Sequence, residues 1–164
     1  MLKKKIKWRI GDIFLVPQID KKYSLGQIIG CEAEVLNSVI CAFYDIRFDS
    51  VPSKLIIDKL PQNKLISIQF TTKDLLDNGA WIIIGNVRPI ICKLFQNNLK
   101  KLRRNEFVGT IIEGSGIIEE FLNAFYGLVP WDDWQDPYYL DKLLISSDKK
   151  QKNIKLTKHK NNTV

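Results

Sequence analysis

The sequence predicts an α+β fold: a strongly curved, mostly antiparallel β-sheet, or an SH3-like barrel, with one main helix packed beside it. Three observations support this prediction. Two apolar runs separated by a turn form a hairpin over residues 10–30, several short apolar runs follow, and residues 117–126 show helical periodicity. Together they indicate a sheet of about five or six strands.

The hairpin is the first predicted element. Residues 10–16 are apolar on both sides of an extended chain, so this strand should be covered on both faces. Residues 17–22 supply a turn, and residues 23–30 return as an antiparallel partner. Gly26, in the middle of the second strand, indicates a bulge or a close backbone approach.

Four further strands are predicted from short apolar or alternating runs, and they are residues 39–44, 66–70, 81–84 and 107–112. The run at 81–84 is apolar throughout, which is typical of a central strand. A short turn of helix, begun by Thr72, is expected after the strand at 66–70. The pattern over residues 90–102 fits either a helix or a strand.

The main helix is predicted over residues 117–126. Its apolar side chains recur with helical spacing on one stripe, and they are Ile117, Ile118, Phe121, Leu122 and Phe125. Gly127 is a suitable C-terminal cap. A shorter second helix is expected over residues 139–145.

Length and composition predict one globular domain, residues 1–148, followed by a basic and mobile tail, residues 149–164. A chain of 164 residues with 45% apolar content can bury a substantial core. The sequence has no apolar run near the ~20 residues of a membrane helix, and its basic start lacks the apolar core of a signal peptide. The cysteines, Cys31, Cys41 and Cys92, lie within apolar stretches and are typical of reduced, buried thiols. We therefore expect a cytoplasmic protein without a membrane contact.

The formal charge of +7 comes from the two ends of the chain. Of 25 basic residues, five lie in 1–9 and six in 149–164, which leaves 14 basic against 18 acidic residues, or −4, in 10–148. A nucleic-acid-binding domain normally carries its positive charge on the folded face that meets phosphate. The one internal basic cluster contains Lys100, Lys101, Arg103 and Arg104, and it is first explained as a solvated face.

The sequence lacks the residues that most catalytic mechanisms and metal sites require. The single histidine, His159, lies in the tail, which excludes imidazole catalysis and triads within the fold. The cysteines do not match a zinc-ligand spacing, and residues 109–116 lack the lysine of a phosphate-binding loop. We expect no cofactor and no metal. A carboxylate pair drawn from Asp132, Asp133 and Asp136 remains a catalytic option, although such acids more often form turns.

The segment 130–139, PWDDWQDPYY, combines aromatic rings with carboxylates. Over residues 113–148 eight acids accompany one lysine, a local charge of −7. Buried rings supply much of the affinity at interfaces, and complementary charge speeds the encounter with a basic partner. The candidate partner-binding residues are Glu119, Glu120, Trp131, Asp132, Asp133, Trp134 and Asp136. The structural alternative makes both tryptophans core residues and the aspartates caps of the following turn.

Two stretches near the amino terminus, GDIFLVP at residues 11–17 and YSLGQIIG at residues 23–30, have a recognisable pattern. This pattern resembles the opening of the bacterial immunity protein 26 family, in which a Gly-Asp-hydrophobic-Phe strand ends in proline. The resemblance covers about the first half of the chain, fits residues 82–89 less specifically and does not include residues 131–139. It implies a non-catalytic antitoxin that binds a polymorphic or contact-dependent toxin.

The leading hypothesis is therefore an immunity protein that neutralises a cognate toxin through an acidic and aromatic surface. The toxin would be a nuclease or another effector with a basic surface, whose site for phosphate the acids would occupy. One alternative is a nucleic-acid-binding module that uses the basic ends and residues 100–104. Another is a small carboxylate-dependent hydrolase.

Overall fold

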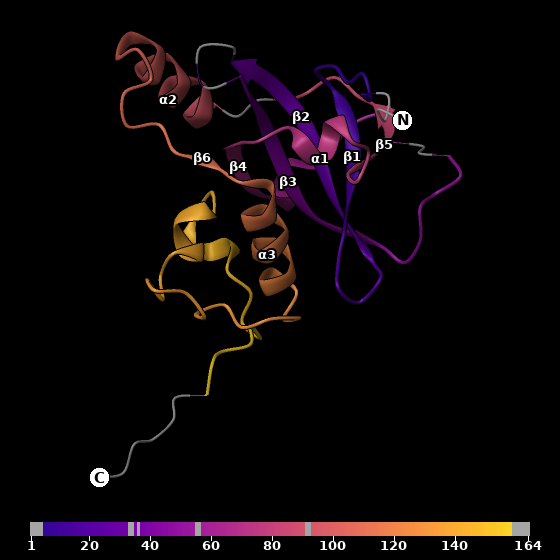
Figure 1. Cartoon of the computed structure of the whole chain (residues 1–164), viewed down its shortest axis with the longest axis vertical. Helices are drawn as coiled ribbons and strands as arrows, with labels where there is room; N and C mark the ends of the chain where they lie inside the picture. Colours follow the sequence, from indigo (N-terminus) through magenta and orange to yellow (C-terminus); the bar gives the residue numbers. More distant parts are fainter. Residues whose placement is uncertain (1–4, 33–34, 36, 55–56, 91–92, 159–164) are drawn as a thin grey trace.

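The computed structural model describes residues 5–32, 35, 37–54, 57–90 and 93–158. Its elements, in chain order, are β1 (Asp12–Pro17), β2 (Tyr23–Glu32), β3 (Ser38–Phe48), η1 (Gln62–Lys64), β4 (Leu65–Thr71), α1 (Asp74–Asp77), β5 (Ile82–Asn86), α2 (Lys93–Arg104), β6 (Ile112–Glu113), α3 (Ser115–Phe125), η2 (Leu140–Leu143) and η3 (Ser147–Lys149). Strands and helices are both present and the sheet is mostly antiparallel, which confirms the predicted mixture (Figure 1).

The six strands form one sheet in the order β5-β1-β2-β3-β4-β6. The pairs from β5 to β4 are antiparallel, while β6 runs parallel to β4. In the described part of the chain β5 and β6 are the two edges, so the sheet is open and the predicted SH3-like barrel is not formed. The central strands are apolar on both faces, and a separate layer covers each face, so the sheet has no need to close around a single core.

Two apolar cores lie on opposite faces of the sheet. Alternation along β1 sends Phe14 and Val16 into one core and Ile13 and Leu15 into the other, and all four are fully buried. Helix α3 and the C-terminal segment complete the first core, whereas α2 packs on the second. In Figure 1 the C-terminal segment lies beside α3, and its residues 142–145 also line a hollow together with α2.

Gly26 allows an aromatic ring to lie flat on the sheet. It pairs with Phe14 across β1 and β2, and a Cβ atom at position 26 would lie 2.4 Å from the Phe14 ring. That ring stacks on Trp81, with 5.1 Å between centroids and 1° between planes. The predicted close approach at Gly26 is therefore made by a side chain from the neighbouring strand.

The two longer helices differ in how well the sequence predicted them. The helix expected at 117–126 is α3, which begins two residues earlier and ends at Phe125. The region left open between helix and strand contains α2, whose Phe95, Leu99 and Leu102 pack against the second core. The molecule therefore has a second helix, α2, whose 12 residues exceed the 11 of α3. An ion pair between Arg103 and Glu32 joins α2 to the end of β2.

Two strand predictions are wrong in detail. Residues 107–112 do not form a strand, because most of this run is a turn after α2 and only Ile112 enters β6. Val108 is 78% exposed, so its apolar character does not reflect a buried strand. The run at 81–84 was expected to be central, yet β5 is an edge strand with half-buried isoleucines.

The two shorter predicted helices are present as shorter helical segments. The turn of helix after β4 is α1, which begins at Asp74. The helix expected at 139–145 is a single 3₁₀ segment, η2. In the described part of the chain no helix has the length and apolar character needed to cross a membrane.

Candidate functional site

The candidate residues lie on α3 and on the segment that follows it. Helix α3 buries Ile118, Phe121 and Phe125 against the sheet, which turns Glu119 and Glu120 away from the centre of the core. Both glutamates are half-buried. The Glu119 carboxylate accepts a hydrogen bond of 3.2 Å from the Trp81 indole nitrogen, so it also helps to fix the start of β5.

Trp131 is a core residue. Its side chain is 1% exposed, and its ring lies 5.8 Å from that of Phe121, centroid to centroid. The indole nitrogen donates to Asp141 Oδ1 at 3.2 Å, and the backbone nitrogen donates to the Lys155 carbonyl at 2.8 Å. Trp131 therefore anchors the acidic segment, residues 130–141, to α3, as the structural alternative for this residue requires.

Asp132 holds the carboxyl-terminal tail. Its two carboxylate oxygens accept hydrogen bonds from the Thr157 backbone nitrogen at 2.6 Å and from the Thr157 hydroxyl at 2.8 Å. Both bonds end on a charged acceptor, which makes them stronger than neutral ones. Asp132 is thus a structural contact as well as a member of the acidic segment.

The side chains of Asp133 and Asp136 are accessible to solvent. Asp133 is exposed, and the Asp136 side chain is 41% exposed. Asp136 accepts hydrogen bonds from Lys142 Nζ at 2.6 Å and from the Tyr138 backbone nitrogen at 3.0 Å. The bond from Lys142, helped by that from Tyr138, holds the pKa of Asp136 below its ordinary value. Its carboxylate therefore stays ionised at neutral pH.

Trp134 belongs to an aromatic pair that sequence reasoning did not assemble. Its ring stacks on Tyr139 at 4.9 Å between centroids and 20° between planes. The Tyr139 hydroxyl donates to Glu113 Oε2 at 2.7 Å. Burial, and then the Glu113 carboxylate, raise the pKa of Tyr139 to about 12. Next to this pair, Tyr138 is 70% exposed.

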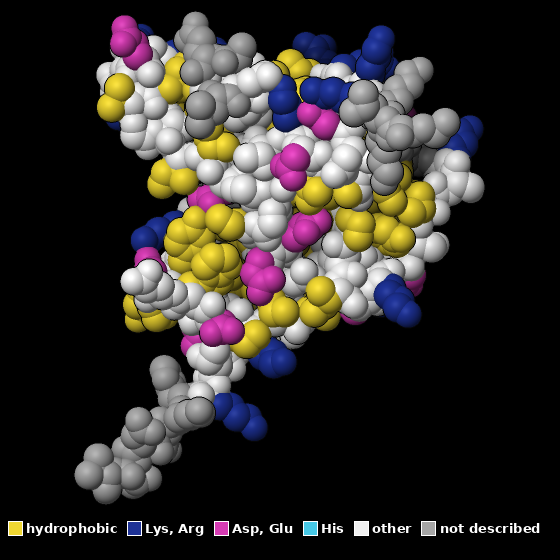
Figure 2. All heavy atoms as spheres, in the orientation of Figure 1, with side chains coloured by type: hydrophobic (Ala, Val, Ile, Leu, Met, Phe, Trp, Pro, Cys, Tyr) yellow, Lys and Arg dark blue, Asp and Glu magenta, His cyan; other side chains and the backbone are white. Residues whose placement is uncertain are grey.

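Several of these residues are exposed or half-buried, and buried contacts form a frame that holds the segment in place. Figure 2 shows acidic side chains between groups of hydrophobic side chains on one face of the molecule. We define the acid-aromatic surface by its solvent-exposed or half-buried members, which are Glu120, Asp133, Trp134, Asp136 and Tyr138. Trp131 and Tyr139 lie beneath it and are the frame. The sequence signal for Tyr138 was its place in the PWDDWQDPYY segment, but its exposure was not predictable.

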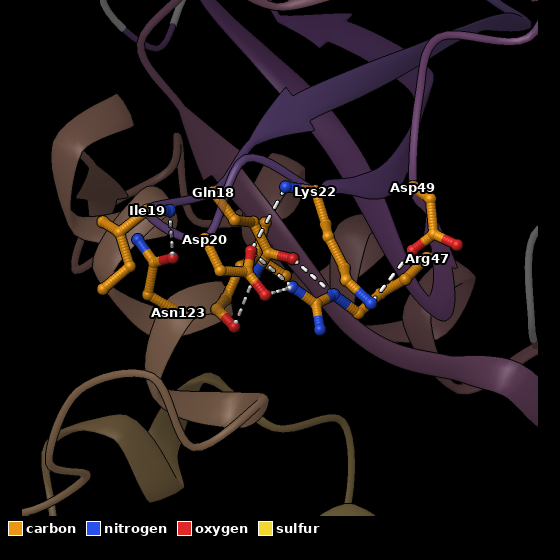
Figure 3. Close-up of polar contacts among 8 residues, drawn as sticks. Gln18, Ile19, Asp20, Lys22, Arg47, Asp49 and Asn123 are labelled. Carbon is orange, nitrogen blue, oxygen red and sulfur yellow. Dashed lines mark hydrogen bonds and ion pairs between the residues drawn. The ribbon is translucent and has the colours of Figure 1, made fainter.

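A second polar cluster fixes the position of α3 (Figure 3). Arg47 on β3 donates to Gln18 Oε1 at 2.7 Å and to Asp20 Oδ2 at 2.6 Å, and its guanidinium lies 4.5 Å from the Tyr126 ring centroid. Gln18 donates in turn to the carbonyl of Leu122 on α3, at 3.1 Å. The β1–β2 turn, β3 and the end of α3 are thereby joined.

The charges of this cluster are well matched. Burial alone would raise the pKa of Asp20, but hydrogen bonds from Arg47 and from the Lys22 backbone hold it below its ordinary value. Asn123 Oδ1 accepts from the Ile19 backbone nitrogen at 3.2 Å, which adds a direct tie to α3. Sequence analysis did not identify this cluster, because its members are far apart along the chain.

The described residues contain one buried and one exposed free thiol: Cys41 is buried as predicted, whereas Cys31, at the end of β2, is exposed, so its predicted burial is wrong. Among the described residues no three His, Cys, Asp or Glu side chains come together in a group that could hold a metal ion. Burial strongly raises the pKa of the Cys41 thiol, which therefore remains protonated. His159 and Cys92 lie outside the described residues.

The fold defines a class: an α+β domain with an open, mostly antiparallel sheet, followed by an acidic and aromatic segment. The chain belongs to the immunity protein 26 family, whose family model matches residues 9–93. The protein is accordingly a polymorphic toxin immunity protein with a cognate toxin as its partner. Searches of curated proteins and of solved structures find no match.

The matched range spans β1 to β5 and ends at the first residue of α2. It confirms the resemblance that the sequence carries at residues 11–17 and 23–30. The acid-aromatic surface lies outside it, on α3 and the segment that follows.

Proposed function

We propose that this immunity protein neutralises its toxin by direct, non-catalytic binding through the acid-aromatic surface. One observation carries the proposal: the exposed Asp133, the half-exposed Asp136 and the exposed Tyr138 lie within six residues of one another, on a segment that the buried Trp131 holds against α3. Rigid placement of a few aromatic and charged groups is what a tight interface requires, because little entropy is then lost on binding.

The partner we propose is a toxin with a basic surface, such as a nuclease that holds phosphate. The carboxylates would steer such a surface during the encounter, and the rings of Trp134 and Tyr138 would supply apolar contact once it has docked. Binding there would cover the toxin's phosphate site. We place this event in the cytoplasm, which the free thiols of Cys31 and Cys41 favour.

The test compares two charge reversals that change the net charge equally. Asp133→Lys alters an exposed member of the surface, and Asp58→Lys alters an exposed acid outside it. The toxin is taken as the product of the neighbouring gene, and association is followed by surface plasmon resonance. Asp133→Lys should slow association and weaken binding by about 1–3 kcal/mol, while Asp58→Lys should have little effect.

The melting temperature serves as the structural control. Because Asp133 is exposed, Asp133→Lys should melt within a degree or so of the natural protein. Toxin binding that is equally strong in both variants and in the natural protein would place the interface elsewhere.

A second candidate function, nucleic-acid binding, is favoured by the outer face of α2. Lys100, Lys101 and Arg104 are exposed there, with Asn97 and Asn98 beside them around a shallow hollow of about 410 Å³. If this face binds DNA through three phosphate contacts, log affinity should fall against log salt with a slope of about −3. A triple substitution of the basic residues to glutamine should abolish that slope.

A further inference from the structure

The basic tail lies against the acidic segment. Between Trp131 and Thr157 the two stretches are joined by the bond from the Trp131 backbone to Lys155 and by the paired bonds from Thr157 to Asp132. Lys150 adds an ion pair with Asp141, at 2.7 Å, and its ammonium lies 5.5 Å from the Trp131 ring centroid. The tail thus brings N–H donors and a lysine to the carboxylates of the segment.

These are the contacts that a basic partner would make with the same segment. A lysine on a carboxylate, a cation above an indole and an amide on a carboxylate are the recognised ways of binding a basic peptide. They engage Asp132, which directly precedes Asp133 of the acid-aromatic surface, and Asp141, which lies three residues after Tyr138. The tail therefore occupies acidic groups that an approaching basic segment would contact.

The tail is held mainly by polar contacts, which also include a bond of 2.8 Å from Lys149 Nζ to the Asn63 carbonyl. Lys155 and Lys158 are exposed, and Leu156 is 56% exposed, so little apolar area is buried by this part of the chain. Ile154 is the described tail residue that packs against the first core. Segments held by few buried contacts open at low free energy compared with the core.

We propose that residues 149–158 form a basic strap that covers part of the acidic segment in the free protein and is displaced by a basic segment of the toxin. This inference rests on the proposed function of the acid-aromatic surface. The apparent affinity for the toxin is then reduced, because only molecules with an open strap can bind. The strap also favours partners that are basic enough to displace it.

The test uses the full chain and a fluorescently labelled decalysine peptide as the probe, at low ionic strength where charge contacts are least screened. The variant Lys150→Met/Thr157→Val loosens the strap at two of its contacts. Lys152→Met is the matched control, because it also removes one tail lysine but alters an exposed side chain. Affinities are measured by fluorescence anisotropy.

The loosened variant should bind the probe about tenfold more tightly than the natural protein, a change equal to about 1.4 kcal/mol. Lys152→Met should change the affinity by less than about twofold, since it removes charge without releasing the strap. In the natural protein, saturation with the probe should also speed hydrogen exchange at the Thr157 amide, which donates to Asp132. Equal affinities in the two variants, no binding by any of them, or an unchanged exchange rate would overturn the strap.

The experiments distinguish a failure of the strap proposal from a failure of the proposed binding surface. Full toxin binding by Asp133→Lys would refute the proposed role of the acid-aromatic surface, whatever the hydrogen exchange of the tail shows. Weak toxin binding by Asp133→Lys, together with a Thr157 amide that stays protected under saturating probe, would refute the strap alone and leave the tail as a fixed brace.

Discussion

Replacing Gly26 with alanine tests the packing that underlies the whole molecule. The new Cβ would lie 2.4 Å from Cζ and 2.5 Å from Cε2 of Phe14, far inside van der Waals contact. The ring cannot move aside freely, because it is fully buried and stacked on Trp81, and Phe43 meets its edge at 6.1 Å between centroids. The backbone of β2 must therefore shift or the stack must open.

Overpacking of this kind costs about 1–3 kcal/mol. For a domain of this length that loss lowers the melting temperature by about 2–4 °C for each kcal/mol. The displacement should also reach the candidate site, because Trp81 donates to Glu119 on α3. We therefore expect lower stability together with a change in tryptophan fluorescence.

Urea unfolding measures the loss, and Gly116→Ala provides the control. Position 116 is exposed within α3, and a Cβ there would meet nothing within 4 Å. Alanine should thus be neutral or stabilising there, by up to about 1 kcal/mol, through helix propensity. If Gly26→Ala were as stable as the natural protein, the ring would not rest on Gly26 as described.

Three further outcomes follow from the polar contacts. Arg47→Met should lower the free energy of unfolding in urea by about 1–3 kcal/mol, because Asp20 loses its ion pair, whereas exposed Arg104→Met should change it by less than about 0.5 kcal/mol. Tyr139→Phe should cost about 1 kcal/mol by the same measurement, because the bond to Glu113 is lost. The pKa of Tyr139 is raised from 10.0 to about 12, so its contribution to stability should be complete below pH 10 and lost as the pH rises towards 12. Tyrosinate absorbance should accordingly show a step near pH 12 that Tyr139→Phe removes, while Tyr126, whose pKa burial raises further, stays protonated there; a titration unchanged by the substitution would contradict the assignment.

Local patterns in the sequence predicted the elements whose packing is simple. The stripe from Ile117 to Phe125 identified α3, since each of its apolar side chains faces the same core. The hairpin was predictable because its apolar runs are separated by a turn. The same reasoning failed at residues 107–112, FVGTII, where apolar residues are frequent but Val108 and Ile111 remain exposed. A short apolar run does not tell whether a neighbouring strand is present to pair.

The candidate site was predictable as a segment but not as a geometry. Trp131 and Trp134 have similar acidic neighbours in sequence, yet one is buried on Phe121 and the other is half-buried against Tyr139. That difference depends on contacts with residues distant in the chain, among them Lys155 in the tail. The composition of the tail predicted mobility, which stays a prediction, and gave no indication that Thr157 contacts Asp132.

Glu113 links two parts of the molecule that otherwise look independent. Its carbonyl accepts from the Thr72 backbone nitrogen at 3.2 Å and from the Thr71 hydroxyl at 2.8 Å, while its carboxylate accepts from Tyr139. The main chain of this residue is thus part of the sheet edge, and its side chain supports the aromatic pair. A toxin that tilts Tyr139 on docking would pull on the same residue that closes the edge of β4. The NMR amide resonance of Thr72 would then report toxin binding from a distance, even where the toxin obscures the signals of the surface itself.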